Sequence, residues 1–342
     1  MSWLPPDEEE AYGEYDESAV RQRPNPKANK PRTKTRPEYK DAIAGRVFSV
    51  DRGRYGVWVD ENTPEERQLV ATKSRDLGKY SVVTGDWVDL VGDLSGDDGS
   101  LARIIRVQER STLLRRSADD TDAVERIIVA NADQMLIVVA AANPEPRTRL
   151  VDRYLVAAFD AGIRPILCIT KTDLQDPAPF LANFAGLGLD VIESRSDQFA
   201  VEEITARLQG HTTVAVGHSG VGKSTLVNAL VPSAQRAVGR VNDVTGRGRH
   251  TSSSTVSLRI GTGWIVDTPG VRSFGLGHID PANILRSFTD LATLALDCPR
   301  GCTHLPDAPD CAIILGVEAG ALGELGEQRL ESFQRLITTL GS

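Results

Sequence analysis

The chain has 342 residues, which is enough for two or three domains with more than one hydrophobic core. Its formal net charge of -8 excludes a generally basic coat for nucleic acid, so any RNA contact must come from local basic surfaces. No apolar signal core opens the sequence and no apolar run approaches a membrane span, so we expect a cytoplasmic protein that has no membrane partner.

Residues 1–39 lack hydrophobic periodicity, with an acidic run from Asp7 to Glu17 and then a proline-broken basic run. Such a segment cannot bury enough apolar surface to offset its ordering entropy, so we expect a disordered tail. It is either a solvated leader or a basic arm that contacts RNA phosphates.

Residues 40–110 contain short runs that alternate every second residue, punctuated by glycine, aspartate and proline: 45–48, 55–59, 68–71, 86–90 and 102–107. Five short strands predict a small Greek-key barrel of the oligonucleotide-binding (OB) type, a fold that grips nucleic acid. Nearby basic residues are either a phosphate-facing edge or merely solvated: Arg103, Arg106, Arg110, Arg115 and Arg116.

Residues 111–278 alternate buried strands with helices, which predicts an α/β domain with a mostly parallel sheet covered on both faces. The expected strands are 135–140, 165–169 and 190–192, with a helix over 150–161.

The strand 165–169 ends where open α/β sheets bind ligands, at Thr170, Lys171, Thr172 and Asp173. An aspartate there can accept hydrogen bonds from N1–H and the exocyclic amine of guanine, a pair of donors that adenine cannot offer. Lys171 would pack its stem along the base or ribose. The loop at 193–196, which contains Ser194, would close over the base.

A glycine-rich loop joins a strand at 213–216 to a helix that begins at Lys223. Glycines turn the backbone so that successive N–H groups and the helix N-terminus hold an anion. Lys223 would reach the β- and γ-phosphates, and the Ser224 hydroxyl would bind Mg²⁺. The predicted phosphate-binding residues are Gly217, His218, Ser219, Gly220, Val221, Gly222, Lys223, Ser224 and Thr225.

A polar, glycine-rich stretch at 246–255 lies where a nucleotide-sensing switch would. After the strand 264–266, Asp267 would hold Mg²⁺ through water and the Gly270 N–H would meet the γ-phosphate, while Thr251 would also bind Mg²⁺. Because Val271 cannot orient water, His250 is either the water-orienting group or an exposed loop histidine.

Residues 279–342 are expected to be mainly helical, with a last packing helix over 322–340. Cys298, Cys302, His304 and Cys311 suit one closed, tetrahedral, structural Zn²⁺ site. The alternative is a set of unligated buried cysteines.

The base-reading motif precedes the phosphate loop here, which reverses the order of an ordinary guanine-nucleotide switch and indicates a circular permutation. With 246–251, 267–270 and the Cys3His cluster, this order resembles the ribosome small-subunit-dependent GTPase family RsgA, also called the YjeQ/YloQ family. In that family asparagine usually stands where this chain has Thr170.

The resemblance implies a circularly permuted P-loop GTPase domain between an N-terminal OB-type barrel and a C-terminal helical zinc domain. It implies Mg²⁺-dependent GTP hydrolysis stimulated by the small ribosomal subunit, late maturation of that subunit, and rRNA binding controlled by the GTP or GDP state. We also expect a monomer.

Two other functions remain open. One is a zinc-containing RNA-binding assembly factor whose nucleotide site is passive. The other, an ATP-dependent P-loop enzyme, is disfavoured by Asp173.

Overall fold

The computed structural model describes residues 39–117, 125–232, 255–268, 274, 276 and 279–340. Residues 1–38 of the predicted tail lie outside them, as do the predicted site residues His250, Thr251 and Gly270. All features below belong to one unit that spans residues 41–342.

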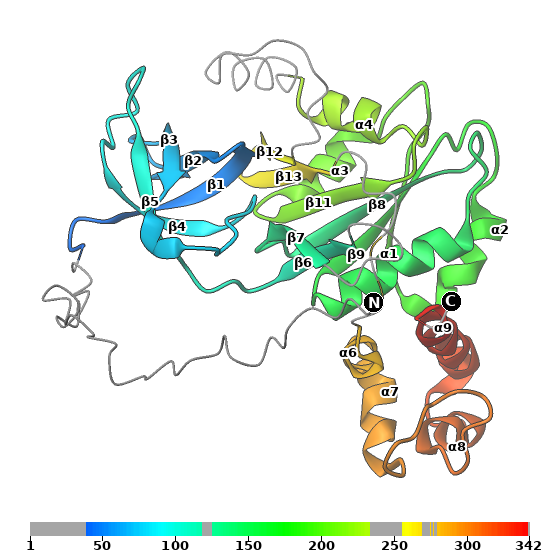
Figure 1. The fold of residues 1–342 in the computed structure, drawn as a ribbon. Helices are drawn as coiled ribbons and strands as arrows, with labels where there is room; N and C mark the ends of the chain where they lie inside the picture. The colour runs from blue at the N-terminus through cyan, green and yellow to red at the C-terminus, as the bar shows by residue number, and fades with distance from the viewer. Residues whose placement is uncertain are drawn as a thin grey trace, which may run out of the picture. The chain divides into compact units, whose positions relative to one another are not determined.

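The first five strands close into a barrel (Figure 1). They are β1 (Ile43–Asp51), β2 (Arg54–Val59), β3 (Arg67–Lys73), β4 (Trp87–Gly92) and β5 (Ala102–Val107), with a short 3-10 turn, η3 (Arg75–Leu77), after β3. The order β1-β2-β3-β5-β4 closes because β1 also pairs with β4. Alternate apolar residues such as Val47, Val57 and Ile104 are fully buried inside. The prediction of a small five-stranded barrel is confirmed.

Two of the basic residues near the last barrel strand are paired with acids of the barrel itself. Arg106 hydrogen-bonds Asp89, and Arg110 holds the fully buried Asp86 at 2.6 Å. The Arg110 side chain is almost fully buried by this contact, whereas the Arg106 side chain remains largely exposed at the surface.

Five parallel strands form the second part of the sheet, in the order β10-β9-β8-β11-β13. They are β8 (Gln134–Ala140), β9 (Arg164–Thr170), β10 (Asp190–Glu193), β11 (Thr212–Gly217) and β13 (Gly263–Asp267). Because they run the same way, their carboxyl ends meet at one edge. The predicted mostly parallel sheet is confirmed.

Helices cover both faces of this sheet (Figure 1), and the side chains of β8 divide between the two cores. Ile137 packs with α1 (Thr148–Asp160) on one face, whereas Leu136 packs with α3 (Val201–Leu208) and α4 (Lys223–Leu230) on the other. A short helix, α2 (Ala178–Leu181), continues into the 3-10 turn η4 (Ala182–Leu187).

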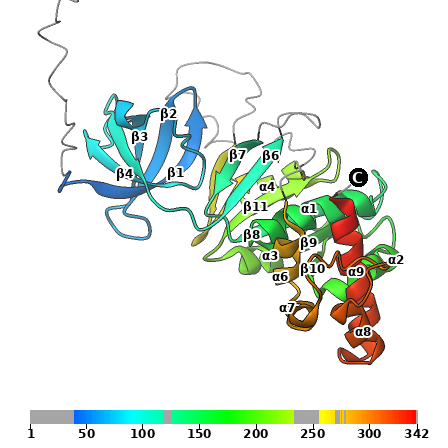
Figure 2. The same ribbon diagram turned by 60° about the horizontal axis from the view of Figure 1, so that its bottom comes forward.

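Three strands were not predicted. A separate two-stranded hairpin, β6 (Leu113–Ser117) with β7 (Glu125–Ala130), follows the barrel (Figure 2). The strand β12 (Val256–Ile260) is antiparallel to β13 and also pairs with β1 at Ser49 and Val256. Through that pairing the barrel and the parallel strands share one hydrogen-bonded sheet.

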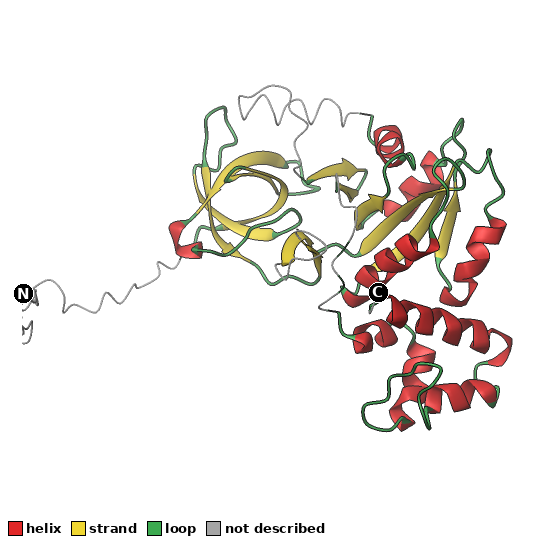
Figure 3. Ribbon diagram, turned by 45° about the vertical axis from the view of Figure 1, so that its right-hand side comes forward, coloured by secondary structure: helices red, strands yellow, loops and turns green. Residues whose placement is uncertain are grey.

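The described C-terminal part contains helices and loops (Figure 3). Its elements are α6 (Pro281–Arg286), α7 (Thr289–Leu294), η5 (Ala295–Asp297), α8 (Ala312–Glu318), η6 (Gly323–Leu325) and α9 (Gly326–Thr339). The Asp280 carboxylate caps α6 by accepting a hydrogen bond from the Ala282 amide at 2.9 Å. The predicted last helix starts four residues later than expected, because η6 precedes it.

These helices share a hydrophobic core with α1. The Phe288 and Phe333 rings lie 5.4 Å apart, and both are almost fully buried. On the same side, Arg335 Nε lies 3.1 Å from the carboxylate of the buried Asp152. Among the described residues, no helix has the length and apolar character needed to cross a membrane.

Candidate functional site

The predicted phosphate loop lies between the end of β11 and the start of α4, at the carboxyl edge of the parallel strands. Gly220 and Gly222 have φ values of 86° and 92°, a region that side-chain-bearing residues rarely adopt. Val221 points into the core, whereas Ser219, Ser224 and Thr225 are exposed. The His218 ring nitrogen Nδ1 lies 2.8 Å from the Ser219 carbonyl oxygen.

The predicted base-reading motif contacts this loop directly. The buried Thr170 hydroxyl donates to the Val221 carbonyl oxygen at 2.6 Å and lies 3.3 Å from the Val139 carbonyl oxygen. Lys171 Nζ donates to the Gly220 carbonyl oxygen at 2.9 Å and also to that of Asn143. The structure therefore brings the two motifs together, although they are about 50 residues apart along the chain.

Asp173, the predicted guanine-reading residue, lies just after the carboxyl end of β9. It accepts hydrogen bonds from Ser196, in the loop that follows β10. These hydrogen bonds hold the pKa of Asp173 below its usual value, so its carboxylate is ionised at neutral pH. The predicted Ser194 is buried and accepts a hydrogen bond from the Thr172 amide at 3.3 Å through its carbonyl oxygen. Ser194 thus anchors the loop, and Ser196 contacts the Asp173 carboxylate.

Asp267 ends β13, next to the phosphate loop, because β13 pairs with β11 and places Asp267 opposite Ala215. Its carboxylate forms an ion pair with the ammonium of Lys223. The neighbouring Thr268 hydroxyl fixes the strand end by donating to the Ala215 carbonyl oxygen at 2.9 Å. The predicted lysine and carboxylate are therefore in direct contact.

The four predicted metal ligands converge in the C-terminal part, and their ligand atoms all lie within 4.8 Å of one another. The Sγ atoms of Cys298 and Cys311 are 3.9 Å apart and lie 3.7 and 3.6 Å from His304 Nδ1. A tetrahedral ion with bonds of about 2.3 Å to sulfur and about 2.0 Å to nitrogen separates its ligand atoms by roughly 3.5–3.8 Å. The cluster, with Cys302, therefore fits a tetrahedral metal ion.

Burial shifts the pKa of two residues of this cluster. It raises the pKa of Cys311 to about 11 and lowers the pKa of His304, so a neutral thiol and a neutral imidazole are favoured. A neutral imidazole is ready to bind a cation, whereas the thiol must lose its proton. Gln334 orients the turn by donating to the His304 carbonyl oxygen at 3.0 Å.

Comparison with known proteins identifies the family of the chain. The family model for RsgA GTPase matches residues 107–277. The small ribosomal subunit biogenesis GTPase RsgA of Pseudomonas syringae pv. tomato is 36% identical over 292 residues, which cover 80% of this chain and 82% of that protein. The chain belongs to the RsgA GTPase family.

Two solved structures share the fold of the chain. YloQ, described as a circularly permuted GTPase, superposes with a TM-score of 0.63 at 25% identity, covering 88% of this chain and 96% of that chain. YjeQ from Thermotoga maritima, at 24% identity, has the same fold with a TM-score of 0.64 over 88% of this chain and 99% of that chain. Membership of the RsgA GTPase family makes the protein a GTP-hydrolysing enzyme with a circularly permuted GTPase fold.

The Thr170 hydroxyl connects the two loops. We expect Thr170→Val to lower the free energy of unfolding by about 1–2 kcal/mol, because it leaves the buried Val221 carbonyl unpaired. We also expect weaker guanine-nucleotide binding, measured by titration calorimetry alongside denaturant unfolding. Thr170→Ser, which keeps the hydroxyl, is the matched control. A Thr170→Val protein with wild-type stability and affinity would show that the hydroxyl does not join the loops.

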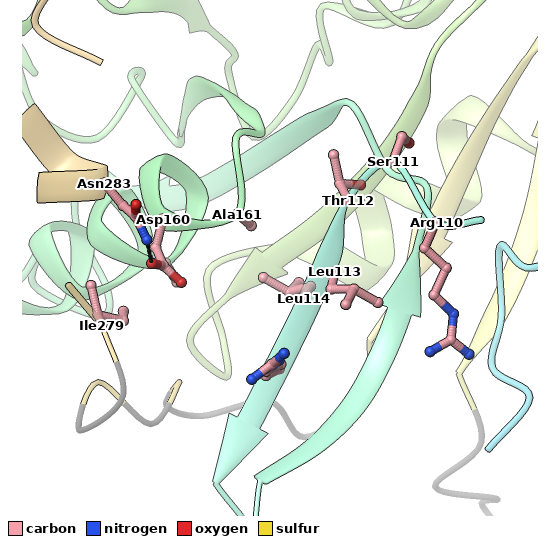
Figure 4. A pocket seen from close by; sticks show the side chains of 11 residues that line it. Arg110, Ser111, Thr112, Leu113, Leu114, Asp160, Ala161, Ile279 and Asn283 are labelled. Atoms are coloured by element: carbon pink, nitrogen blue, oxygen red, sulfur yellow. Dashed lines mark hydrogen bonds between the residues drawn. The ribbon is translucent and has the colours of Figure 1, made fainter. Parts of the chain in front are cut away.

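A cavity of about 360 Å³ lies elsewhere in this RsgA-family chain, between β6, α1 and α6 (Figure 4). Asn283 donates to Asp160 at 2.8 Å on one wall, and the amide of Ser111 donates to Asn131 at 2.8 Å on another. None of its lining residues belongs to the predicted nucleotide site. Most of its polar groups already form hydrogen bonds, mainly to residues outside the lining, such as Arg110 with Asp86 and Thr112 with the Ala132 carbonyl oxygen.

Proposed function

We propose that the chain hydrolyses GTP during late maturation of the small ribosomal subunit, that the subunit stimulates hydrolysis, and that the GTP or GDP state controls rRNA and subunit binding. Relatives from Pseudomonas syringae are named for biogenesis of the small ribosomal subunit, which supports the assembly role. The contact of Thr170 with Val221 supports the nucleotide assignment, because the proposed base-reading residues and the proposed phosphate loop then lie side by side.

In this proposal, Asp173 accepts from guanine and the stem of Lys171 lies along the base or ribose. The amides from Gly217 to Thr225 surround the phosphates, and Lys223 neutralises charge on the β- and γ-phosphates. Ser194 holds the loop that closes over the base. Gly270, Thr251 and His250 keep their predicted roles at the γ-phosphate, at Mg²⁺ and at the attacking water, outside the described residues.

The ion pair between Lys223 and Asp267 has a consequence for binding. An incoming triphosphate must take the ammonium of Lys223 away from Asp267, which releases a carboxylate at the strand end. That carboxylate and the Ser224 hydroxyl are oxygen ligands of the kind that Mg²⁺ prefers, and Mg²⁺ bound with GTP would neutralise charge on the phosphates. Phosphate binding by Lys223 and metal binding by Asp267 are thereby coupled.

We propose Zn²⁺ as the metal of the Cys3His cluster, with a structural role. Four protein ligands fill a tetrahedral ion and leave no open position for a substrate. The cluster lies among helices that pack on α1 of the GTPase part, so any nucleotide-driven movement of these helices must carry α1 along or break the contact of Arg335 with Asp152.

We expect purified small ribosomal subunits to raise the rate of GTP hydrolysis by about tenfold or more, because the valine after Gly270 cannot orient the attacking water and a partner must position it. The measurement is phosphate release from GTP with and without small subunits. Large ribosomal subunits at the same concentration serve as the control. Equal rates with and without small subunits would favour an RNA-binding assembly factor whose nucleotide site is passive.

A further inference from the structure

The carboxylate of Asp173 accepts two hydrogen bonds from one residue of the neighbouring loop. The Ser196 amide donates to Oδ1 at 2.6 Å, and the Ser196 hydroxyl donates to Oδ2 at 2.5 Å. Guanine presents the same arrangement, because its N1–H and its exocyclic amine are adjacent donors on one edge. Ser196 therefore offers Asp173 a pair of donors equivalent to those of the base.

The two donors also use the side of the carboxylate that a base needs. A carboxylate has about four acceptor positions, two on each oxygen. Two donors that lie close together bind the two oxygens at once, one donor to each oxygen, from one side of the carboxylate. Because the amide and the hydroxyl belong to one residue, they approach together in this bidentate way. A guanine edge cannot make its own paired contact from that side while Ser196 remains there.

The loop is anchored at Ser194, so Ser196 can move away from Asp173 while the start of the loop stays in place. Ser194 is 2% exposed, its amide donates to the Ile169 carbonyl oxygen at 2.8 Å, and its hydroxyl accepts from the Ala200 amide at 3.1 Å. Ser196 itself is exposed. Its neighbour Arg195 pairs with Asp197 at 2.8 Å, within the same exposed stretch.

We propose that Ser196 is an internal competitor of guanine: it closes on Asp173 when no base is bound and must be displaced before a guanine nucleotide binds. The proposal rests on the proposed function, in which Asp173 reads guanine. The apparent affinity of a site that is open in only a fraction of molecules is reduced by that fraction. Removing one of the two competing donors raises the open fraction, and GTP and GDP gain equally because they share the base.

The test is Ser196→Ala in the full chain, with dissociation constants for GTP and GDP measured by titration calorimetry in the presence of Mg²⁺. We expect both constants to fall by the same factor, about three- to tenfold. The affinity for ATP, measured by competition, should not change, because adenine offers Asp173 no such pair of donors. Gln198→Ala, in the same exposed loop, is the control and should match the wild type. Constants for GTP and GDP that stay equal to those of the wild type, or that rise, overturn the proposal.

A second variant separates this proposal from the assignment of Asp173. Asp173→Asn should transfer preference from GTP to xanthosine triphosphate, whose 2-oxo group accepts a hydrogen bond where guanine donates one. If the preference transfers while Ser196→Ala leaves the guanine-nucleotide constants unchanged, Asp173 reads guanine and the competitor is refuted. If the preference does not transfer, the guanine assignment is wrong and the competitor proposal fails with it.

Discussion

Lys223→Ala is expected to slow GTP hydrolysis by about a hundredfold or more, the loss typical when one fixed positive or hydrogen-bonding group is removed from a transition state. Lys223 begins α4, directly after the phosphate loop, and its ammonium already contacts the carboxylate at the end of β13. Phosphoryl transfer depends mainly on positioning and charge neutralisation, and Lys223 contributes to both. The measurement is single-turnover GTP hydrolysis with small ribosomal subunits present, together with GTP affinity.

The loss must be separated from a general effect on folding. Lys223→Ala also leaves Asp267 without its partner, but the Asp267 side chain is 28% exposed and water can solvate it. We therefore expect little change in melting temperature. Lys79→Ala removes an exposed lysine of the barrel and should hydrolyse GTP as the wild type does. Wild-type kinetics in Lys223→Ala would remove the phosphate loop from the proposed mechanism.

Elements whose signal is local were predictable from the sequence. The five barrel strands alternate apolar and polar residues, and the strand at 135–140 is apolar throughout, so both kinds were placed within a few residues. The metal ligands were predictable for a similar reason: three cysteines and a histidine lie within 14 residues, and the structure brings their ligand atoms together.

Features that depend on long-range pairing were not predictable. The pairing of β12 with β13 and β1 joins segments that lie far apart in the chain, and no local pattern shows it. The strand itself does alternate apolar and polar residues at Val256, Leu258 and Ile260, a local signal that was missed because it directly follows the polar stretch 246–255. The sequence left Arg106 and Arg110 as either a phosphate-facing edge or solvated charges, because Asp89 and Asp86, which bind them, lie 17 and 24 residues away. The sequence shows Ser196 only as a polar loop residue. Its contact with Asp173, 23 residues earlier, depends on the fold.

Cys311→Ser is expected to lose the bound metal and to destabilise the C-terminal helices by at least about 3 kcal/mol, because the binding energy of a structural metal contributes directly to folding. Cys311 is almost fully buried at the start of α8, and its Sγ lies 3.6 Å from His304 Nδ1. A serine hydroxyl is a poor replacement for a thiolate at a closed tetrahedral site. The measurements are zinc per chain by elemental analysis and thermal unfolding with and without a chelator.

Cys168→Ala provides the matched control, because Cys168 is a fully buried thiol of β9 outside the cluster. We expect this variant to lose some stability through the cavity it leaves but to keep one zinc per chain. When a chelator has removed the metal from every protein, Cys311→Ser should be as stable as the wild type. Cys168→Ala should still be less stable than the wild type. Phe288 and Phe333 pack against each other in the core that α9 shares with α1. Loss of the metal should loosen this packing and make the chain near these two residues easier to cleave by a protease. A Cys311→Ser protein with a full complement of zinc would exclude this cluster as the metal site.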